Sequence, residues 1–400
     1  MKIKIVLAVV LAMVLSGCVG MQDSEGWRSS QKNEFLKILE TDKYMSICNQ
    51  QALYKQVKVN ENSKLMSKLL VAYTNNLANG CLVNTSFKSF GAYKQKVSDS
   101  DIKRKLKAGQ SIEQILKPYV PEYRQFDALI KQYNARKNSA TTSKELLHNI
   151  RLNIERVKLM KPNLGDTYVL VNIPEYQIRV IEDDNTSVKM KIVVGTRKNK
   201  TPIFSENLQY ITLNPAWNVP DSIARNEIIP KTLRDPGYLR KHRLVMRKDY
   251  NLNSPALSFN SVNARAYRGG KGYVPFKFIE VPSNRNALGR VKFIFPNHHS
   301  VYMHDTPAKH LFKRKKRSYS HGCVRLEKPK YMLEYISKNY TAHEYADVKA
   351  KYGSRKTHYL KIVKPLPVHT AYLTTYVNQS GKLSVFSDIY GYNKAQQLNF

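Results

Sequence analysis

Residues 320–326 read Ser-His-Gly-Cys-Val-Arg-Leu, and this stretch decides how the rest of the chain is interpreted. Cys323 stands two residues after His321, and a second histidine, His304, begins the upstream sequence His-Asp-Thr-Pro. Thiol catalysis requires a thiolate, a base that generates it and donors for an oxyanion. The stretch contains candidates for all three, whereas a cysteine without such neighbours is usually a small buried apolar residue.

Strand-like alternation surrounds this stretch on both sides. The predicted strands cover residues 168–173, 177–181, 188–194, 209–213, 291–295, 301–303, 358–363 and 370–377. Tight turns between the first three favour an antiparallel sheet. Residues 222–286 interrupt the alternation with a helix-compatible segment and several turns, and they predict an insertion over the sheet. Residues 329–340 predict a helix directly after the motif.

Residues 34–160 have helical rather than strand periodicity. Asn79-Gly80 predicts a stop between two helices. Thr142 and Glu145 have the spacing of a capping box that would open a further helix. We interpret this half as an all-helical domain that packs on itself, with a glycan- or partner-binding scaffold as the alternative.

The motif containing Cys323, with the upstream His304, resembles the signature of the L,D-transpeptidases, which have a YkuD-type catalytic domain. The order of the weaker motifs resembles the larger YcbB-like subgroup; these are Leu170-Val171-Asn172-Ile173-Pro174, the Trp217 segment, Ile229-Pro230-Lys231 and Asp235-Pro236-Gly237-Tyr238. The resemblance covers residues 164–375. It implies an α+β chain: an N-terminal helical domain, then a mainly β catalytic domain, a β-sandwich, in which 222–286 is a helical and loop capping insertion. Residues 376–400 are left as a C-terminal tail.

The resemblance also implies a reaction. Cys323 would attack the tetrapeptide stem of peptidoglycan between diaminopimelate and the terminal D-Ala, forming a thioester. The amine of a neighbouring diaminopimelate would then resolve the thioester into a 3→3 cross-link. We interpret His304 as the base and later proton donor, because it ends a predicted strand and some subgroup members have serine in place of His321. His321 then shapes the loop or contacts substrate.

Five further residues are candidates at this site. Gly322 is expected to turn its own amide or that of Cys323 toward the oxyanion, or it is a plain turn glycine. Arg325 fits a substrate carboxylate, or an ion pair that braces the loop. Tyr302 shares a strand face with His304 and either lines the cleft or packs. The remaining candidates for substrate binding are Ser320 and Trp217, the latter with a core role as the alternative.

The first residues resemble an export signal. A basic start and a short apolar run, too short to span a bilayer comfortably, precede Leu-Ser-Gly-Cys, which is similar to a lipobox ending at Cys18. Residues 1–18 are then a lipoprotein signal peptide, with an ordinary cleaved signal as the alternative, and residues 19–33 a tether. Val19, by resemblance to Gram-negative lipoproteins, favours the outer membrane, facing the periplasm.

Charge and cysteine content narrow the partners. The net charge of +36 would indicate nucleic acid in a cytosolic protein, but the export signal argues against that compartment. Anionic peptidoglycan stems and the membrane surface are the expected partners, unless the charge serves solubility alone. Cys48 and Cys81 form either a disulfide or two buried thiols in an oxidising compartment. No motif predicts a metal or a cofactor.

Two other functions remain open from the sequence. Water in place of the amine would make the protein an L,D-carboxypeptidase or endopeptidase that hydrolyses the same bond. A lipid-anchored cell-wall-binding scaffold is the alternative without primary catalysis. On family grounds, carbapenem-type β-lactams are expected to acylate Cys323.

Overall fold

The computed structural model describes most of the 400-residue chain; the described ranges are 22–83, 93–354 and 356–399. The expected signal peptide 1–18 and its lipid acceptor Cys18 lie outside them. No helix among the described residues is long and apolar enough to cross a membrane.

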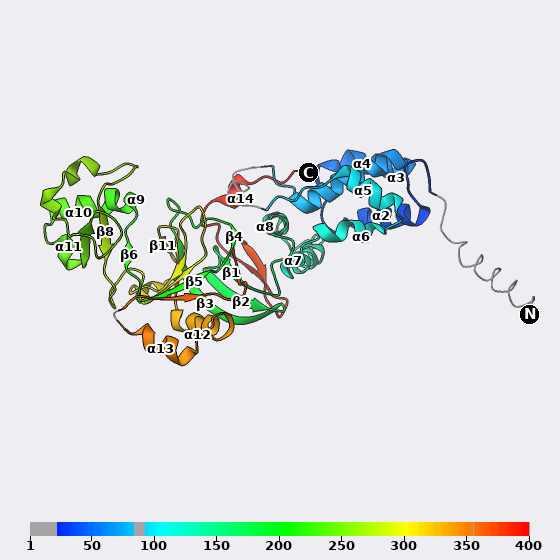
Figure 1. Cartoon of the computed structure of the whole chain (residues 1–400). Helices are drawn as coiled ribbons and strands as arrows, with labels where there is room; N and C mark the ends of the chain where they lie inside the picture. Colours follow the sequence, from blue (N-terminus) through cyan, green and yellow to red (C-terminus); the bar gives the residue numbers. More distant parts are fainter. Residues whose placement is uncertain (1–21, 84–92, 355, 400) are drawn as a thin grey trace, which may run out of the picture. The chain divides into compact units, whose positions relative to one another are not determined.

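The chain forms two compact units (Figure 1). Unit 1 comprises Met1–Leu164 and Leu373–Phe400, and unit 2 comprises Gly165–Tyr372. Unit 1 therefore contains both ends of the chain, and unit 2 is inserted between its two segments. The predicted order of a helical part followed by a mainly β part is confirmed.

Unit 1 is built from helices α2 (Ser29–Thr41), α3 (Gln51–Asn60), α4 (Ser63–Asn79), α5 (Asp99–Lys107), α6 (Ile112–Leu116), α7 (Gln125–Asn134) and α8 (Lys144–Lys158). The predicted stop after α4 is confirmed, because Gly80 follows the last helical residue with φ of +69°. The predicted capping box is shifted by one residue. Ser143, not Thr142, is the N-cap of α8 and accepts a hydrogen bond from the Leu146 amide.

The proposed tether differs from the structure. Trp27 is 1% exposed, and its indole nitrogen donates to the Ser67 hydroxyl at 2.9 Å. Its ring stacks on that of Phe35, with the centroids 5.8 Å apart. The described part of residues 19–33 is therefore packed into unit 1, because burying the aromatic residue stabilises the fold more than a solvated linker would.

Cys48 and Cys81 are joined by a disulfide inside unit 1. The buried Glu155 carboxylate lies beside it and accepts the Cys81 amide at 2.7 Å. Arg151 and Lys158 pair with the same carboxylate at 2.9 and 3.2 Å. Burial lowers the pKa of Lys158 to about 8. Helix α8 thus carries a buried ion cluster that is satisfied by pairing.

The C-terminal residues are part of this core and not a loose tail. Residues 376–400 were expected to stand apart, but β15 (Thr375–Val377), β16 (Leu383–Val385) and α14 (Tyr392–Ala395) all belong to unit 1. The guanidinium of Arg156, on α8, donates to the Gln396 side-chain oxygen at 2.7 and 3.0 Å and to Asn393 at 2.8 Å. It also donates to the Thr374 hydroxyl at 3.2 Å. A buried cation with these partners fixes the returning segment on α8.

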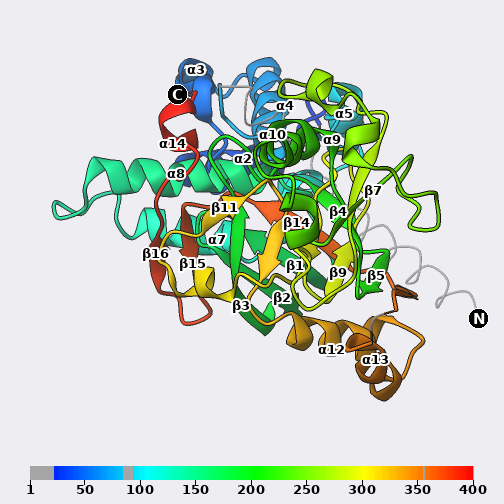
Figure 2. The same cartoon turned by 90° about the vertical axis from the view of Figure 1, so that its left-hand side faces the viewer.

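Unit 2 contains an eleven-stranded sheet. Its strands are β1 (Thr167–Asn172), β2 (Gln177–Glu182), β3 (Asn185–Gly195), β4 (Ser205–Asn207), β5 (Tyr210–Leu213), β9 (Val291–Ile294), β10 (Met303–His304), β11 (Ser318–Ser320), β12 (Val324–Leu326), β13 (His358–Lys361) and β14 (Pro367–Ala371). The order is β13-β5-β9-β10-β12-β3-β2-β1-β14-β4, with β11 on β3. The neighbouring strands β1, β2 and β3 can be followed in Figure 2. Three successive residues of β1, 169–171, are 0% exposed, so both faces of this strand are covered.

Two helices follow the motif, α12 (Pro329–Tyr340) and α13 (Tyr345–Tyr352), and the bounds of α12 agree with the prediction. The last predicted strand, 370–377, is divided in the structure. Residues 367–371 form β14 of unit 2, whereas 375–377 form β15 of unit 1.

The predicted insertion is a small lobe with its own core (Figure 1). It contains a three-stranded sheet, β6-β8-β7, as well as helices. Its elements are β6 (Trp217–Asn218), α9 (Asp221–Ile223), the π-helix η4 (Ala224–Ile228), α10 (Ile229–Arg234), α11 (Tyr238–Lys241), β7 (Leu244–Arg247) and β8 (Lys277–Glu280). The expectation of helices and loops alone therefore missed the sheet, whose strands are only two to four residues long.

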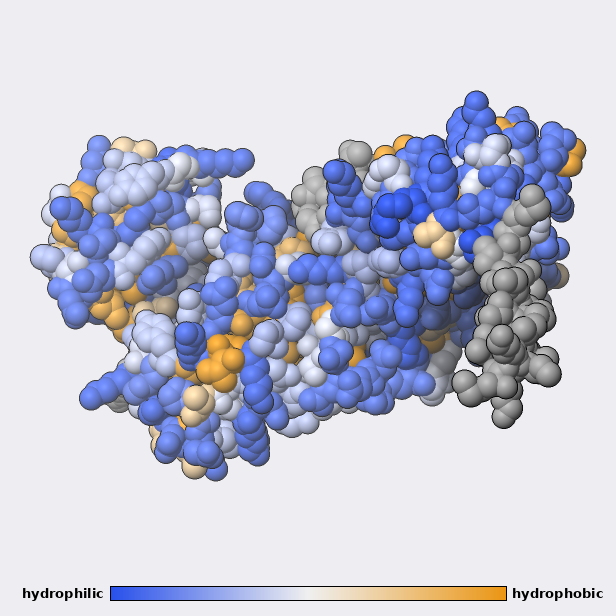
Figure 3. All heavy atoms as spheres, turned by 45° about the vertical axis from the view of Figure 1, so that its right-hand side comes forward, coloured by the Kyte–Doolittle hydropathy of each residue, from blue (hydrophilic) through white to orange (hydrophobic). Residues whose placement is uncertain are grey.

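The visible surface is mostly hydrophilic, with apolar residues in small separate groups (Figure 3). This distribution agrees with the excess of 66 Lys and Arg over 30 Asp and Glu. The apolar residues are concentrated in the cores of the two units.

The Arg156 network predicts a large stability effect in unit 1. Arg156→Met leaves buried oxygens without a donor and should lower the free energy of unfolding by about 2–4 kcal/mol. Urea unfolding is followed by Trp27 fluorescence in a Trp217→Phe background, since these are the two tryptophans of the chain. The control is Lys144→Met, on the exposed start of α8, which should change stability by less than about 0.5 kcal/mol. Equal effects of the two substitutions would contradict the prediction.

Candidate active site

Three neighbouring strands bring the candidate residues together. In the parallel pair β10–β12, Met303 lies opposite Val324 and His304 opposite Arg325. On the other side of β10, the antiparallel strand β9 places Lys292 opposite His304. Directly paired residues point to the same face of a sheet. Lys292, His304 and Arg325 therefore form a row across one face.

Cys323 lies one step from this row. It precedes β12, and the Val324 amide donates to the Tyr302 carbonyl at 3.0 Å, so Cys323 and Tyr302 lie side by side. Residues two apart on a strand share a face, so Tyr302 lies on the same face as His304, and Cys323 on the same face as Arg325. The thiol and the imidazole are diagonal neighbours, a relation that in sheets spans about 7–8 Å between Cα atoms.

The loop before Cys323 is held by its own hydrogen bonds. The Ser320 hydroxyl donates to the Cys323 carbonyl at 2.5 Å and accepts the Gly322 amide at 3.2 Å. The Thr201 hydroxyl donates to the Gly322 carbonyl at 2.8 Å. Ser320 is 2% exposed and engaged within the loop, so we assign it to loop positioning rather than to substrate contact.

Gly322 adopts φ of +116°, which a residue with a side chain rarely adopts. A Cβ added here would meet its nearest neighbour at 3.5 Å, so backbone conformation and not space selects glycine. Because Ser320 accepts the Gly322 amide, the amide of Cys323 is the better candidate for the oxyanion.

Cys323 is partly exposed, while the next residue in the strand, Val324, is fully buried. Burial of the sulfur raises the pKa of the Cys323 thiol. Contacts with the Tyr302 backbone and hydroxyl and the positive charges of Lys292 and Arg325 act in the opposite direction. The residue is therefore only partly exposed, and its thiol is mainly protonated at neutral pH.

His304 is 4% exposed. Burial, assisted by the charges of Arg325 and Lys292, lowers the pKa of His304 to about 3. The imidazole is consequently neutral at physiological pH. A pKa this low also makes it a weak base in the substrate-free site, so proton transfer from the thiol must be coupled to attack on the substrate. Its Nδ1 has no hydrogen-bond partner within the described part of the chain. The ring packs edge-on against Tyr302, with the centroids 5.5 Å apart.

His321 has a different environment. Its side chain is 47% exposed, and Nε2 lies 2.8 Å from the Glu227 carboxylate of η4 in the inserted lobe. Glu227 also faces Lys231, at 3.3 Å. His321 therefore connects the motif loop to the lobe, and it does not lie in the row that contains His304.

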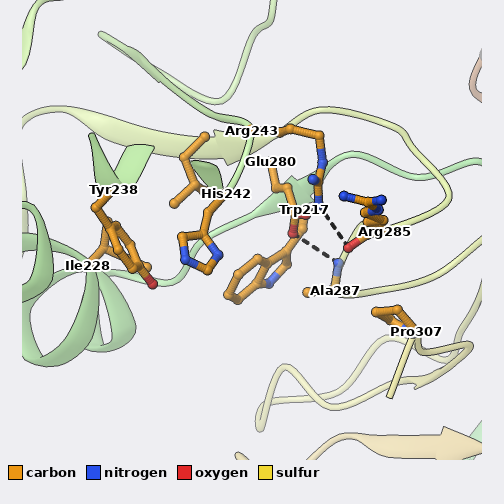
Figure 4. A pocket seen from close by; sticks show the side chains of 10 residues that line it. Trp217, Ile228, Tyr238, His242, Arg243, Glu280, Arg285, Ala287 and Pro307 are labelled. Atoms are coloured by element: carbon orange, nitrogen blue, oxygen red, sulfur yellow. Dashed lines mark hydrogen bonds and ion pairs between the residues drawn. The ribbon is translucent and has the colours of Figure 1, made fainter. Parts of the chain in front are cut away.

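Asp305, which follows His304, and the predicted site residue Trp217 are structural or peripheral. Asp305 accepts the Arg290 and Thr306 amides at 2.9 and 2.7 Å and Lys309 at 2.6 Å, so it braces the chain after His304. Trp217 packs against the core of the lobe and lines a cavity of about 220 Å³ (Figure 4). The other residues lining this cavity include Tyr238, His242, Arg243, Arg285 and Pro307.

Lys292 is the site residue that the sequence analysis missed. Its ammonium lies over the Tyr302 ring, 3.8 Å from the centroid. The available signal was a single lysine within the apolar run Val-Lys-Phe-Ile-Phe of residues 291–295. That run predicts a strand, but only the register of β9 on β10 places the lysine beside the motif.

Within the described ranges, one group of His, Cys, Asp and Glu side chains is close enough to hold a metal ion: Cys48, Cys81 and Glu155. Its two sulfurs are joined to each other in the disulfide. The residues around Cys323 are instead a thiol, a neutral imidazole, a phenol and two cations, which are suited to acyl transfer.

Comparison with known proteins agrees with this chemistry. Residues 166–349 match the family model of the YkuD L,D-transpeptidase catalytic domain, a range that contains β9, β10 and β12. A curated protein of Haemophilus influenzae, provisionally named as an L,D-transpeptidase, is 30% identical over 264 residues. The match covers 64% of this chain and 50% of that protein, so the chain spans about half the length of this relative.

Solved structures were also compared. An L,D-transpeptidase from Mycobacterium smegmatis overlaps 51% of this chain and 58% of its own, at 12% identity and a TM-score of 0.24. The catalytic domain of an E. faecium L,D-transpeptidase overlaps 51% and 96%, at 13% identity and a TM-score of 0.22. The similarity of residues 166–349 to the L,D-transpeptidase catalytic domain is carried by the family model and the curated relative.

The ionisation of the site predicts an alkaline reactivity profile. Because burial raises the pKa of Cys323, its alkylation by iodoacetamide should increase with pH and reach half its maximum above about 8.5, the value of an ordinary cysteine. Rates are measured by mass spectrometry of the peptide containing Cys323.

The matched control is His304→Gln. The imidazole is already neutral above about pH 3, so it does not titrate between about pH 5 and 8. In that range the alkylation rate of Cys323 should therefore depend on pH in the same way in the variant and in the wild type. A wild-type plateau near neutral pH that disappears in the variant would instead indicate a thiolate–imidazolium pair and contradict the assignment.

Proposed function

We propose that this protein is a peptidoglycan L,D-transpeptidase of the YcbB-like subgroup that forms 3→3 cross-links through a thioester on Cys323. The observation that carries the proposal is the register of β10 on β12, with His304 opposite Arg325. This register puts a neutral imidazole and a partly exposed thiol on one face of adjacent strands. The match of residues 166–349 to the transpeptidase domain supports the same chemistry.

The first half of the reaction cleaves an amide. His304 takes the thiol proton of Cys323, the sulfur attacks the carbonyl of the diaminopimelate L-centre, and the Cys323 amide donates to the oxyanion. The carbon–nitrogen bond to D-Ala then breaks. The imidazolium returns its proton to the departing amine, which leaves a thioester on the enzyme.

The second half forms the cross-link. The amine on the D-centre of a second diaminopimelate loses a proton to His304 and attacks the thioester. The carbon–sulfur bond breaks, and the sulfur recovers the proton. If water replaces the amine, the same steps release a tripeptide, so an L,D-carboxypeptidase or endopeptidase is the alternative output.

Location and partners belong to the same proposal. Lipidation of Cys18 would anchor the protein in the periplasm, at the outer membrane of a Gram-negative cell, where its excess of positive charge faces anionic stems and membrane surfaces. Carbapenem-type β-lactams would acylate Cys323 as analogues of the acyl donor. A cell-wall-binding scaffold lacks support from the site, because such a role requires neither the thiol nor the imidazole.

Product analysis tests the activity. Purified protein is incubated with tetrapeptide muropeptides, and the products are identified by mass spectrometry. Dimers joined 3→3 are expected, and tripeptides alone would replace transpeptidation by hydrolysis. Cys323→Ala should give neither product, and unchanged products with this variant would overturn the proposal.

Two histidine variants separate the roles in the same assay. His304→Ala should reduce the rate by about 10²–10⁴-fold, the usual contribution of a general base, without unfolding the protein. His321→Ala should stay within a few-fold of the wild type, because its partner is Glu227 and not the thiol. The reverse pattern would assign the base to His321.

A further inference from the structure

The sheet face that carries His304 and Cys323, which we call the reactive face, also carries two cations. Arg325 and Lys292 flank His304 on the neighbouring strands. Among the described residues, no carboxylate forms an ion pair with either side chain, and the buried Nε of Arg325 has no hydrogen-bond partner. Leaving charged donors unsatisfied at a partly buried site costs stability and usually indicates a missing partner.

Other buried cations of unit 2 are satisfied within the protein. Arg179 donates to Glu175 at 2.8 Å, and Lys277 donates to Asp221 at 2.7 and 2.9 Å. Arg317 donates to four backbone carbonyls, at 2.9 to 3.5 Å. These three cations of unit 2 are paired within the protein, in contrast to Lys292 and Arg325.

Both cations lie on the sheet face that carries Cys323. The Lys292 ammonium is held over the Tyr302 ring at 3.8 Å, and Tyr302 is the residue beside Cys323. The positive charges of Lys292 and Arg325 both favour the ionised form of Cys323, which requires them to be close to it. An anion bound between them would therefore lie within reach of a scissile bond at the sulfur.

We propose that Lys292 and Arg325 form a clamp for a free carboxylate of the acyl donor, adjacent to the bond that Cys323 attacks. This inference rests on the proposed function and adds its donor specificity. The donor carries two such groups: the terminal carboxylate of the leaving D-Ala and the carboxylate on the D-centre of diaminopimelate. We assign the clamp to the terminal carboxylate of D-Ala. Arginine and lysine at the scissile bond would then select stems in which D-Ala is the last residue.

Binding tests the clamp independently of the reaction. In a Cys323→Ala background no acylation occurs, and calorimetry measures the affinity for a tetrapeptide donor and for its C-terminal amide. The free carboxylate should bind about tenfold tighter or more, as expected for two charge-assisted hydrogen bonds. Lys292→Gln and Arg325→Gln should each reduce this preference, and the double variant should remove it.

The controls separate charge from packing. Lys189→Gln, at an exposed position on β3, should keep the wild-type preference. Lys292→Arg retains the charge and should keep most of it. A donor amidated only on the diaminopimelate carboxylate should bind like the unmodified donor. Loss of affinity with that donor, and not with the C-terminal amide, would place the clamp on the other carboxylate and overturn our assignment.

Reactivity distinguishes the clamp from a role in ionising the thiol. In otherwise wild-type protein, Lys292→Gln removes a charge that favours the thiolate, so the alkylation of Cys323 by neutral iodoacetamide should become slower. Acylation by the carboxylate donor should fall by at least about tenfold more than alkylation, because the clamp is also lost. Equal affinity for the tetrapeptide donor and its C-terminal amide would contradict the clamp. An equal fall in alkylation and acylation in Lys292→Gln would also contradict it. Donor binding without any acyl-enzyme in the wild type would sink the proposed function and leave the clamp standing.

Discussion

The register of three strands, β9, β10 and β12, is the constraint on which the site depends. Strand β10 is only two residues long, yet it has a partner on each side. Because side chains alternate between faces, a slip of one residue would turn His304 away from Cys323. Met303 and Val324, which are 0% exposed, favour the observed register, since the slip would remove both from the core. Apolar packing on one face thus positions polar chemistry on the other.

Much of this arrangement was predictable, and the failures have physical reasons. The motif pointed to Cys323 and His304, and the sequence pattern predicted most strands of the sheet and the bounds of α12. Strands β4, β11 and β12 were not predicted, because three residues are too few to show alternation. Lys292 was not predictable, because its role depends on which strand pairs with β10, a contact that local pattern does not encode. Trp27 was read as part of a linker because the polar residues around it conceal a single buried aromatic ring.

Hydrogen bonding inside the motif was equally hidden from the sequence. Ser320 and Gly322 lie in a stretch whose composition suggests donors for a substrate, but the loop uses both groups for itself. A loop with a residue at positive φ needs such internal bonds to hold one conformation. Cys323 therefore follows a loop that is held by internal hydrogen bonds, and its own main-chain amide is our candidate donor for the oxyanion. His321 contacts Glu227 of the inserted lobe and does not lie in the row that contains His304.

The return of the C-terminal segment to α8 has a consequence for how the protein comes into being. Arg156 is synthesised more than two hundred residues before its partner Gln396, and the whole of unit 2 is made in the interval. The helical unit therefore cannot close its core while the chain is still growing. Unit 2 has its complete sequence earlier, so we expect that the inserted unit folds first. The helices that precede it are completed later, when residues 373–399 emerge from the ribosome.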